Sequence, residues 1–227
     1  MVEPDRCVCN YCLDNEVDEA NMKAHIEYVY DRLYERGFND IQQDHITIAL
    51  VSKKRMNELF PQGEAVGLHS GYSTVWNEKG RKGFNQKVYI LNHLHFINFE
   101  ATLAHELIHG WQLQQNIEDF NGYDSDDRRK ARAEGFAQLG VYIVYSERYK
   151  EARNCCSSSM SSAKEKEEAW VRRKLCVNQM KCWKSDPSPY YGESFRKILK
   201  RINDKNTGVG WPQIIREARL DQLKNYV

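Results

Sequence analysis

The feature that most constrains this chain is a pair of histidines, four residues apart, within a largely apolar segment. His105 and His109 stand in ATLAHELIHGW, residues 101–111. Because residues four apart lie on one face of an α-helix, this spacing predicts a helix on which both imidazoles can reach a single ion. Apolar neighbours such as Leu103 and Ile108 predict that the helix is buried. Two buried histidines need partners, and a shared metal ion would satisfy both.

The residue after the first histidine points to hydrolytic chemistry. Glu106 directly follows His105, where its carboxylate can polarise a water on the metal instead of binding the metal itself. This is the H-E-x-x-H arrangement of zinc-dependent peptidases, in which the glutamate is the general base. We therefore expect one catalytic zinc, with Glu106 as a catalytic residue. A core helix whose histidines are only hydrogen-bonded is the structural alternative.

A catalytic zinc needs a third protein ligand and an open position for water. No histidine follows His109, and the positions three and six residues after it are Gln112 and Gln115. The common short elongation of the motif, with glycine and then histidine at these positions, is therefore excluded. The third ligand must be a carboxylate or a cysteine downstream, or a residue upstream.

The best candidate for the third ligand is Glu134, 25 residues after the second histidine. It lies early in a predicted helix whose apolar residues recur at helical spacing, and a buried glutamate is costly unless it binds a cation. Gly135 should let the two helices approach closely. Glu118 and Asp119 are weaker candidates because they follow the first helix too soon. The alternative for Glu134 is a surface position in the charged run 124–134.

Composition bounds the class of protein. The chain has 227 residues, of which 41% are apolar and 29% charged, and this predicts one globular domain with a hydrophobic core. The 33 basic and 32 acidic residues give a formal net charge of +1, so a strongly cationic nucleic-acid binder is not expected. No apolar run approaches the ~18 residues of a membrane span. The start is unlike a secretory signal, so we expect a cytoplasmic protein without a membrane segment.

The pattern along the chain predicts a mixed α+β fold in four parts. These are a cysteine-containing stub at 1–18, a catalytic core at 19–153, a serine-rich loop at 154–162 and a helical C-terminal lobe packed on the core at 163–227. Strands are expected at 46–51, 67–75 and 87–91, with a hairpin turn at 77–83. Helices are expected at 19–36, 99–115, 126–153, 163–181, 192–203 and 211–224.

Three of the seven cysteines crowd the N-terminus: Cys7, Cys9 and Cys12. In a reducing compartment, clustered cysteines favour metal binding or free thiols over disulfides. These three could hold a second, structural zinc, which needs four ligands. The missing ligands would come from Cys155, Cys156, Cys176, Cys182 or His25. A set of free thiols is the alternative.

Two segments of this chain resemble one family of metallopeptidases. The strings LAHELIHGWQ (103–112) and AEGFAQLGVYIVY (133–145) are similar to the LAHEMMHAW and EEGICQVLAH pair of the DA-one peptidases. These are LIM-domain-associated, ubiquitin-activated metallopeptidases that limit organ growth in plants, with bacterial relatives. Thinner similarities follow in the family's order at residues 9–14, 51–57, 67–71 and 191–196, the last resembling the motif Y-G-x-x-F-R.

The resemblance implies a compact zincin-like fold of the gluzincin type. In such a peptidase a small, curved, mostly antiparallel sheet packs on the active-site helix, and the ligand glutamate lies on the following helix. His105, His109 and Glu134 would be the zinc ligands, and Glu106 the general base. An edge strand would align the substrate backbone, and residues 85–93 are our candidate because they immediately precede the active-site helix.

A hydrolytic zinc site also uses a hydrogen-bond donor opposite the metal. Tyr191, in the segment that resembles Y-G-x-x-F-R, is the candidate for this catalytic role, and simple packing is its alternative. Other available donors are Tyr190, His93 and His95. The two histidines alternate near a predicted strand end, from which both could face the cleft.

We therefore expect a zinc-dependent endopeptidase that acts on protein or peptide substrates. A link to ubiquitin rests on the resemblance alone, because we expect neither ubiquitin-interacting helices upstream of Cys7 nor a complete LIM module.

Two other functions stay open. A SprT-like, DNA-associated metalloprotease also has a buried H-E-x-x-H helix, and residues 163–227 carry 15 basic against 8 acidic residues with interleaved aromatics. Such peptidases usually use a third histidine, and nucleic-acid binding is not expected from so modest a charge excess. The other alternative is a non-catalytic adaptor whose zinc is structural and closed by a fourth protein ligand.

Overall fold

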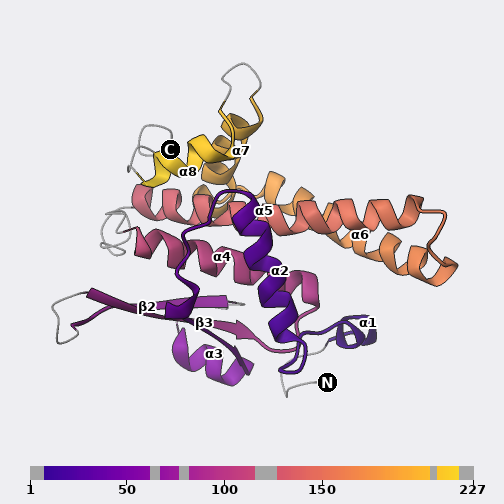
Figure 1. Cartoon of the computed structure of the whole chain (residues 1–227), viewed down its shortest axis with the longest axis horizontal. Coiled ribbons are helices and arrows are strands. Elements are labelled where there is room, and N and C mark those ends of the chain that lie inside the picture. Colours follow the sequence, from indigo (N-terminus) through magenta and orange to yellow (C-terminus); the bar gives the residue numbers. More distant parts are fainter. Residues whose placement is uncertain (1–7, 62–66, 77–81, 116–126, 205–208, 220–227) are drawn as a thin grey trace.

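The computed structural model describes residues 8–61, 67–76, 82–115, 127–204 and 209–219. Two helices, α4 (Phe96–Gln114) and α5 (Asp127–Ser157), lie side by side through the middle of the molecule (Figure 1). A three-stranded sheet lies on the side of α4 that faces away from α5, and α7 (Ser194–Asn203) covers α5 on the opposite side. The expected α+β class is confirmed.

The remaining elements surround this central pair of helices. α2 crosses α4 and α5, α3 lies on the outer face of the sheet, and α6 folds back along α5 (Figure 1). Their bounds are α1 (Asn10–Asp14), α2 (Met22–Glu35), the 3-10 turn η1 (Gln43–His45), α3 (Lys53–Leu59), α6 (Ala163–Ser185), the π-helical turn η3 (Pro189–Glu193) and α8 (Trp211–Arg219).

The sheet mixes parallel and antiparallel pairing. Its strand order is β1-β3-β2, with β1 at Ile46–Val51, β2 at Gly67–Trp76 and β3 at Lys82–Leu91. β1 runs parallel to β3, and β2 runs antiparallel to β3. The expectation of a mostly antiparallel sheet is therefore wrong for the β1–β3 pair. Parallel neighbouring strands need a crossover connection. Here α3 and the edge strand β2 follow β1 in the chain, and β3 then lies between β1 and β2.

β3 is the central strand, and this overturns the expectation that residues 85–93 form an edge. Its backbone pairs with β1 on one side and with β2 on the other. The strand was expected at an edge because it precedes α4 in the chain, but its position in the sheet is set by tertiary pairing. Within the described sheet, β1 and β2 are the edges.

α4 is buried on nearly all sides because it lies between the sheet and α5. His95 caps its first turn, the imidazole Nδ1 accepting a hydrogen bond of 3.2 Å from the backbone N–H of Ile97. Leu103, Leu107 and Ile108 expose no surface. A helix that is apolar all round belongs in a core, so any polar side chain on α4 must find a partner inside the protein.

α4 and α5 approach most closely at Gly140. A Cβ atom at this position would lie 2.6 Å from the carbonyl oxygen of Ala104, so only glycine fits. Gly135 was expected to allow this approach, but it serves another contact: a Cβ atom there would lie 2.5 Å from the Cβ of Ser194, at the start of α7. The two glycines are five residues apart and face different neighbours.

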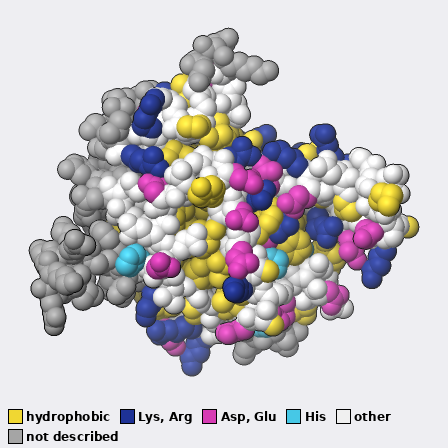
Figure 2. Space-filling view, in the orientation of Figure 1, with side chains coloured by type: hydrophobic (Ala, Val, Ile, Leu, Met, Phe, Trp, Pro, Cys, Tyr) yellow, Lys and Arg dark blue, Asp and Glu magenta, His cyan; other side chains and the backbone are white. Residues whose placement is uncertain are grey.

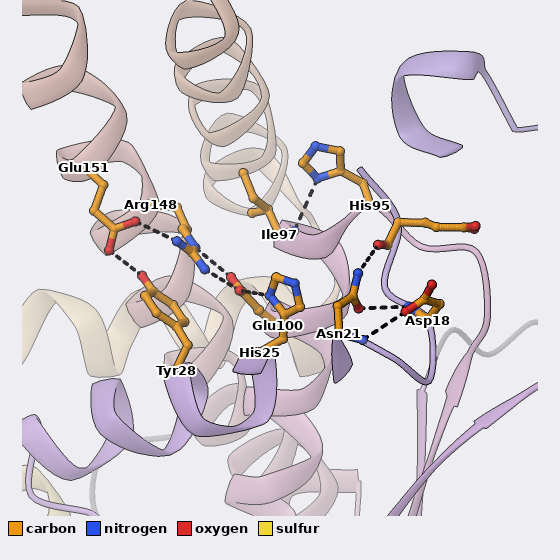
Figure 3. Close-up of polar contacts among 10 residues, drawn as sticks. Asp18, Asn21, His25, Tyr28, His95, Ile97, Glu100, Arg148 and Glu151 are labelled. Carbon is orange, nitrogen blue, oxygen red and sulfur yellow. Dashed lines mark hydrogen bonds and ion pairs between the residues drawn. The ribbon is translucent and has the colours of Figure 1, made fainter. Parts of the chain in front are cut away.

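A buried carboxylate ties three helices together (Figure 3). Glu100 of α4 has no exposed side-chain surface, and both its oxygens accept hydrogen bonds from Arg148 of α5, with the Nε–Oε2 distance 2.7 Å. The Nδ1 atom of His25, on α2, lies 2.7 Å from the same carboxylate. The Arg148 guanidinium also lies over the ring of Tyr28 on α2, 3.6 Å from its centre. Because an unpaired buried charge is strongly destabilising, these contacts fix how the three helices pack.

The hairpin of α5 and α6 is longer than the sequence indicates. α5 continues to Ser157, so only residues 158–162 of the expected loop at 154–162 lie between the helices. α6 then starts with a capping box, in which the Ser162 hydroxyl accepts from the backbone N–H of Glu165 and the Glu165 carboxylate accepts from that of Ser162. Serine composition predicted a loop, but a helix already packed in the core extends through the first serine.

Most other predicted elements agree with the structure to within a few residues, but β3 begins at Lys82, five residues before the predicted strand, and so includes residues 82–83 of the predicted turn. β1 has the predicted bounds, and α4 begins three residues before the expected 99. Residues 77–81 of the predicted hairpin turn, and 220–224 of the last predicted helix, lie outside the described residues. Among the described helices, none combines the length and the apolar content that crossing a membrane requires.

We predict that Gly140→Ala lowers the free energy of unfolding by about 1–3 kcal/mol, the usual cost of overpacking a core. The added methyl group would overlap the Ala104 carbonyl and push α5 away from α4. Chemical denaturation measures the change. Gly210→Ala is the matched control, since a Cβ atom there meets only Pro212 at 3.7 Å. Equal stabilities of the two variants would contradict this account of the helix contact.

Candidate metal centre

Two imidazoles of α4 and one carboxylate of α5 converge on a single point. The Nε2 atoms of His105 and His109 are 3.0 Å apart. The Oε2 atom of Glu134 lies 3.2 Å from the first and 3.3 Å from the second. All three side chains are largely buried, with 13, 8 and 7% of their surfaces exposed. The structure thus brings together the three residues that the sequence predicted as metal ligands.

The size of this triangle fits a tetrahedral metal ion. Zinc binds histidine nitrogen and carboxylate oxygen at about 2.0–2.1 Å, so neighbouring ligands of a tetrahedron lie about 3.3–3.4 Å apart. The three measured separations, 3.0, 3.2 and 3.3 Å, are close to that value. Hydrogen bonds alone would need a proton on at least one Nε2 atom, whereas one divalent cation would satisfy all three atoms together. The residues present therefore fit a zinc ion.

Two glutamines hold the imidazoles in the orientation that metal binding needs. The Nδ1 atom of His109 lies 3.0 Å from the Oε1 atom of Gln112, and the Nδ1 atom of His105 lies 3.2 Å from the Oε1 atom of Gln138. The amide nitrogen of Gln112 donates to the carbonyl of Ala133, which leaves its oxygen to face the imidazole. A neutral histidine that donates through Nδ1 carries its lone pair on Nε2, directed at the common point.

These glutamines were not predicted as site residues. Gln112 is noted in the sequence analysis only as a position where a third histidine is absent, and Gln138 occurs there only within the segment 133–145. One signal could have found them: each lies on the same helix face as a predicted ligand, three residues after His109 and four after Glu134. A polar amide on a face that otherwise packs in the core indicates a partner there.

Glu134 is a carboxylate in this site. Its burial alone would raise the pKa of the side chain, but hydrogen bonds and charge interactions with His105 and His109 outweigh burial and hold the pKa below its ordinary value. It lies about two turns into α5, directly opposite the histidines of the antiparallel helix α4. The weaker candidates Glu118 and Asp119 lie outside the described residues.

Glu106 lies beside the triangle and not within it. Its side chain is largely buried, and with His105 it forms one end of a pocket of about 460 Å³ between α4, α5 and α6. Glu106 thus follows a ligand residue directly in α4 and lines the same cavity as that residue. This is the position that a general base acting on a bound water needs.

Tyr191 reaches the same place from η3. Its ring centre lies 6.2 Å from that of His105, and the side chain lines the pocket. Burial, followed by the negative charges of Glu134 and Glu106 and a hydrogen bond to Glu134, raises the pKa of Tyr191 to about 12. The phenol therefore keeps its proton at neutral pH and can donate a hydrogen bond.

The two histidines of the β3–α4 connection do not face the cleft together. His95 is buried, caps α4 and stacks between Tyr11 and Phe96. Burial and nearby cations lower its pKa to about 4, so the ring stays neutral. His93 lies 2.6 Å from a carboxylate oxygen of Glu16 and has a backbone φ of 54°. Both hold the chain before α4 in place, and the side chain of Tyr190 lies outside the described residues.

The cysteines do not form a second metal group among the described residues. Cys9 caps α1 and Cys12 lies within it, whereas Cys7 falls outside the described part of the chain. The backbone and side chain of Cys12 hydrogen-bond to the Cys9 thiol and lower its pKa, and burial raises the pKa of Cys12 to about 11. Of the described residues, only His105, His109 and Glu134 gather three metal-binding groups. A second zinc at the N-terminus stays a prediction.

Comparisons with models of known protein families, with curated proteins and with solved structures find no match to this chain.

We predict that Gln138→Leu lowers zinc affinity about 10–100-fold, the usual effect of losing the hydrogen-bond partner of a metal-binding histidine. Gln138→Glu keeps an oxygen acceptor facing His105 and should retain most of the affinity. Titration with zinc against a competing chelator gives both values. An equal loss in the two variants would show that the amide packs without orienting the imidazole. Gln43→Leu, in the exposed turn η1, is the control.

Proposed function

We propose that this protein is a zinc-dependent endopeptidase that hydrolyses peptide bonds in protein substrates. The observation that carries the proposal is the convergence of His105, His109 and Glu134 within 3.0–3.3 Å of one another. A glutamate next to the first histidine and an adjoining pocket supply the other requirements of a hydrolase: a general base and room for a substrate.

Each residue of the site has one role in this mechanism. When bound, zinc would supply a Lewis acid that polarises the peptide carbonyl and lowers the pKa of a water molecule. The Glu106 carboxylate takes a proton from the attacking water and then passes it to the leaving amine. The Tyr191 hydroxyl donates a hydrogen bond to the carbonyl oxygen as negative charge develops on it. Gln112 and Gln138 keep the two imidazoles in place.

The arrangement of the elements supports a compact, zincin-like fold of the gluzincin type, as the resemblance to the DA-one peptidases implies. Two ligands lie on α4 and the third lies on α5, the next described helix, and the small sheet packs against α4. We propose β2, and not the central strand β3, as the strand that aligns a substrate backbone. β2 is an edge strand that packs on α4.

Two observations argue against the alternative functions. A structural zinc in an adaptor would need a fourth protein ligand, and the described ligand group has three members. Nucleic-acid binding would need a continuous basic surface, whereas acidic and basic side chains are interspersed on the face shown in Figure 2.

All six described cysteines are free, which supports a reducing, cytoplasmic location.

We predict that Glu106→Gln binds zinc like the wild type and loses about 10²–10⁴-fold in kcat, the range for removal of a general base. His109→Ala should lose the metal, because two ligands remain of three. Metal content by mass spectrometry and cleavage of a casein or peptide-library substrate measure the two effects. Chelation should abolish wild-type cleavage, and zinc should restore it.

His45→Ala is the matched control for the histidine variant, since His45 is exposed in η1 and does not belong to the ligand group. Cleavage by Glu106→Gln at the wild-type rate would contradict the mechanism. Zinc retained at full affinity in His109→Ala would contradict the ligand assignment.

We predict that Tyr191→Phe lowers kcat by about 10²–10³-fold, the effect of losing one donor to a developing oxyanion, with little change in KM or zinc content. Because the pKa of this phenol is raised to about 12, its deprotonation should not reduce wild-type activity below about pH 11. Steady-state kinetics on both proteins measure this. A variant with unchanged kcat would assign Tyr191 to packing.

A further inference from the structure

The pocket beside the metal centre is built from one stripe of side chains on each of three helices. α4 contributes Asn98 and Thr102, α5 contributes Val141 and Tyr145, and α6 contributes Gln179 and Trp183. The members of each pair are four residues apart, so each helix turns a single face to the cavity. His105 and Glu106 close one end, and the cavity therefore continues directly from the point where a bond would be cut.

The dimensions of the pocket suit one large side chain. Asn98 precedes His105 by seven residues, which corresponds to about 10 Å along a helix. This length and the volume of about 460 Å³ exceed what a small residue such as alanine needs. A side chain that enters beside Glu106 could extend along α4 towards Asn98.

The walls of the pocket favour an uncharged occupant. Leu94, Ala101 and Val141 provide apolar surface, and Tyr145 and Trp183 form an edge-to-face aromatic pair with ring centres 4.7 Å apart. The Tyr145 hydroxyl is already bonded to Asn98 Oδ1 at 2.6 Å, which holds this wall in place.

Charge within the pocket is confined to the metal end. Among its lining residues, His105 and Glu106 are the only ones of an acidic or basic type, and burial raises the pKa of the phenols of Tyr145 and Tyr191. Gln179 is neutral. A charged side chain that extended along α4 would leave water without a counter-ion there, which is costly.

We propose that this pocket binds a large, uncharged side chain, aromatic or long aliphatic, of the substrate residue adjoining the cleaved bond. The proposal rests on the proposed peptidase function and adds the class of substrate to it. Thr102 and Gln179, on opposite walls, are then specificity-determining residues that take no part in the chemistry.

The first test is the cleavage preference of the zinc-loaded protein on a peptide library, with cut sites mapped by mass spectrometry. We expect phenylalanine, tyrosine, leucine or methionine at one of the two positions flanking the cut. A peptide with phenylalanine there should exceed its alanine counterpart by about tenfold or more in kcat/KM, since each methylene in a fitted pocket contributes about that factor. A preference for charged or small residues at both positions would overturn the proposal.

Two variants test which residues make the pocket. Thr102→Phe fills the cavity and should remove the preference for large side chains, so that kcat/KM for phenylalanine and alanine peptides comes to within about twofold. Gln179→Glu places a negative charge in the wall and should raise kcat/KM for lysine and arginine peptides about tenfold relative to phenylalanine. Unchanged preferences in Gln179→Glu would overturn the proposal, whether or not Thr102→Phe folds.

Asn178→Asp is the matched control for the charge variant. It adds the same charge on the same helix one residue away, but Asn178 is exposed and does not line the pocket. Its preferences should stay within about twofold of the wild type, as expected for a solvent-screened charge.

A binding assay separates failure of this inference from failure of the peptidase function. Calorimetry gives the affinities of the Glu106→Gln variant for peptides that it does not cleave. Peptides with a large, uncharged side chain should bind more tightly than those with a small or charged one. Adding Thr102→Phe to that variant should abolish this order of affinities. If the wild type cleaves nothing while this order holds, the catalytic proposal fails and the pocket assignment stands. Binding that ignores the side chain would overturn the pocket assignment even if cleavage is observed.

Discussion

The antiparallel contact between α4 and α5 determines most of what this molecule can do. Glycine at position 140 brings the helices to within contact of backbone atoms, and polar ties at several levels then set their register. A shift of one turn, about 5.4 Å, would break every tie at once. The ties, in order along α4, are Asn98 with Tyr145, Glu100 with Arg148, His105 with Gln138, His109 with Glu134 and Gln112 with the carbonyl of Ala133.

This register makes the metal centre a property of the core and not of a loop. His105, His109 and Glu134 belong to helices that are buried over much of their length, so their positions follow from packing. The buried pair of Glu100 and Arg148 lies at the other end of the same contact and prevents one helix from sliding along the other. A precise donor triangle is the outcome that such rigid support should produce.

The candidate site could be predicted from local rules because its parts repeat at helical intervals. The spacing of His105 and His109 defines one helix face, and the cost of burying Glu134 without a cation makes this residue the best candidate for the third ligand. The mixed α+β class can be predicted in the same way, because some segments have apolar residues at helical spacing and others have the apolar pattern of strands. These predictions depend on one helix or strand at a time.

Features that depend on two elements at once could not be predicted in this way. Spacing cannot tell which of Gly135 and Gly140 faces α4, because both are glycines on the same helix. The central position of β3 depends on its pairing with both β1 and β2, and the composition of a strand does not determine its order in the sheet. His95 resembled a cleft residue by its place in the chain, but its partners Tyr11 and Phe96 make it part of the core.

The pocket and the donor triangle are built on partly separate elements. α4 and α5 carry all three of the ligand side chains, whereas α6 contributes Gln179 and Trp183 to the pocket and none of the ligands. Mutations in α6 could therefore redirect the protein to new substrates while the reaction itself stays intact. In evolutionary terms, α6 is the part of this fold that is free to diverge.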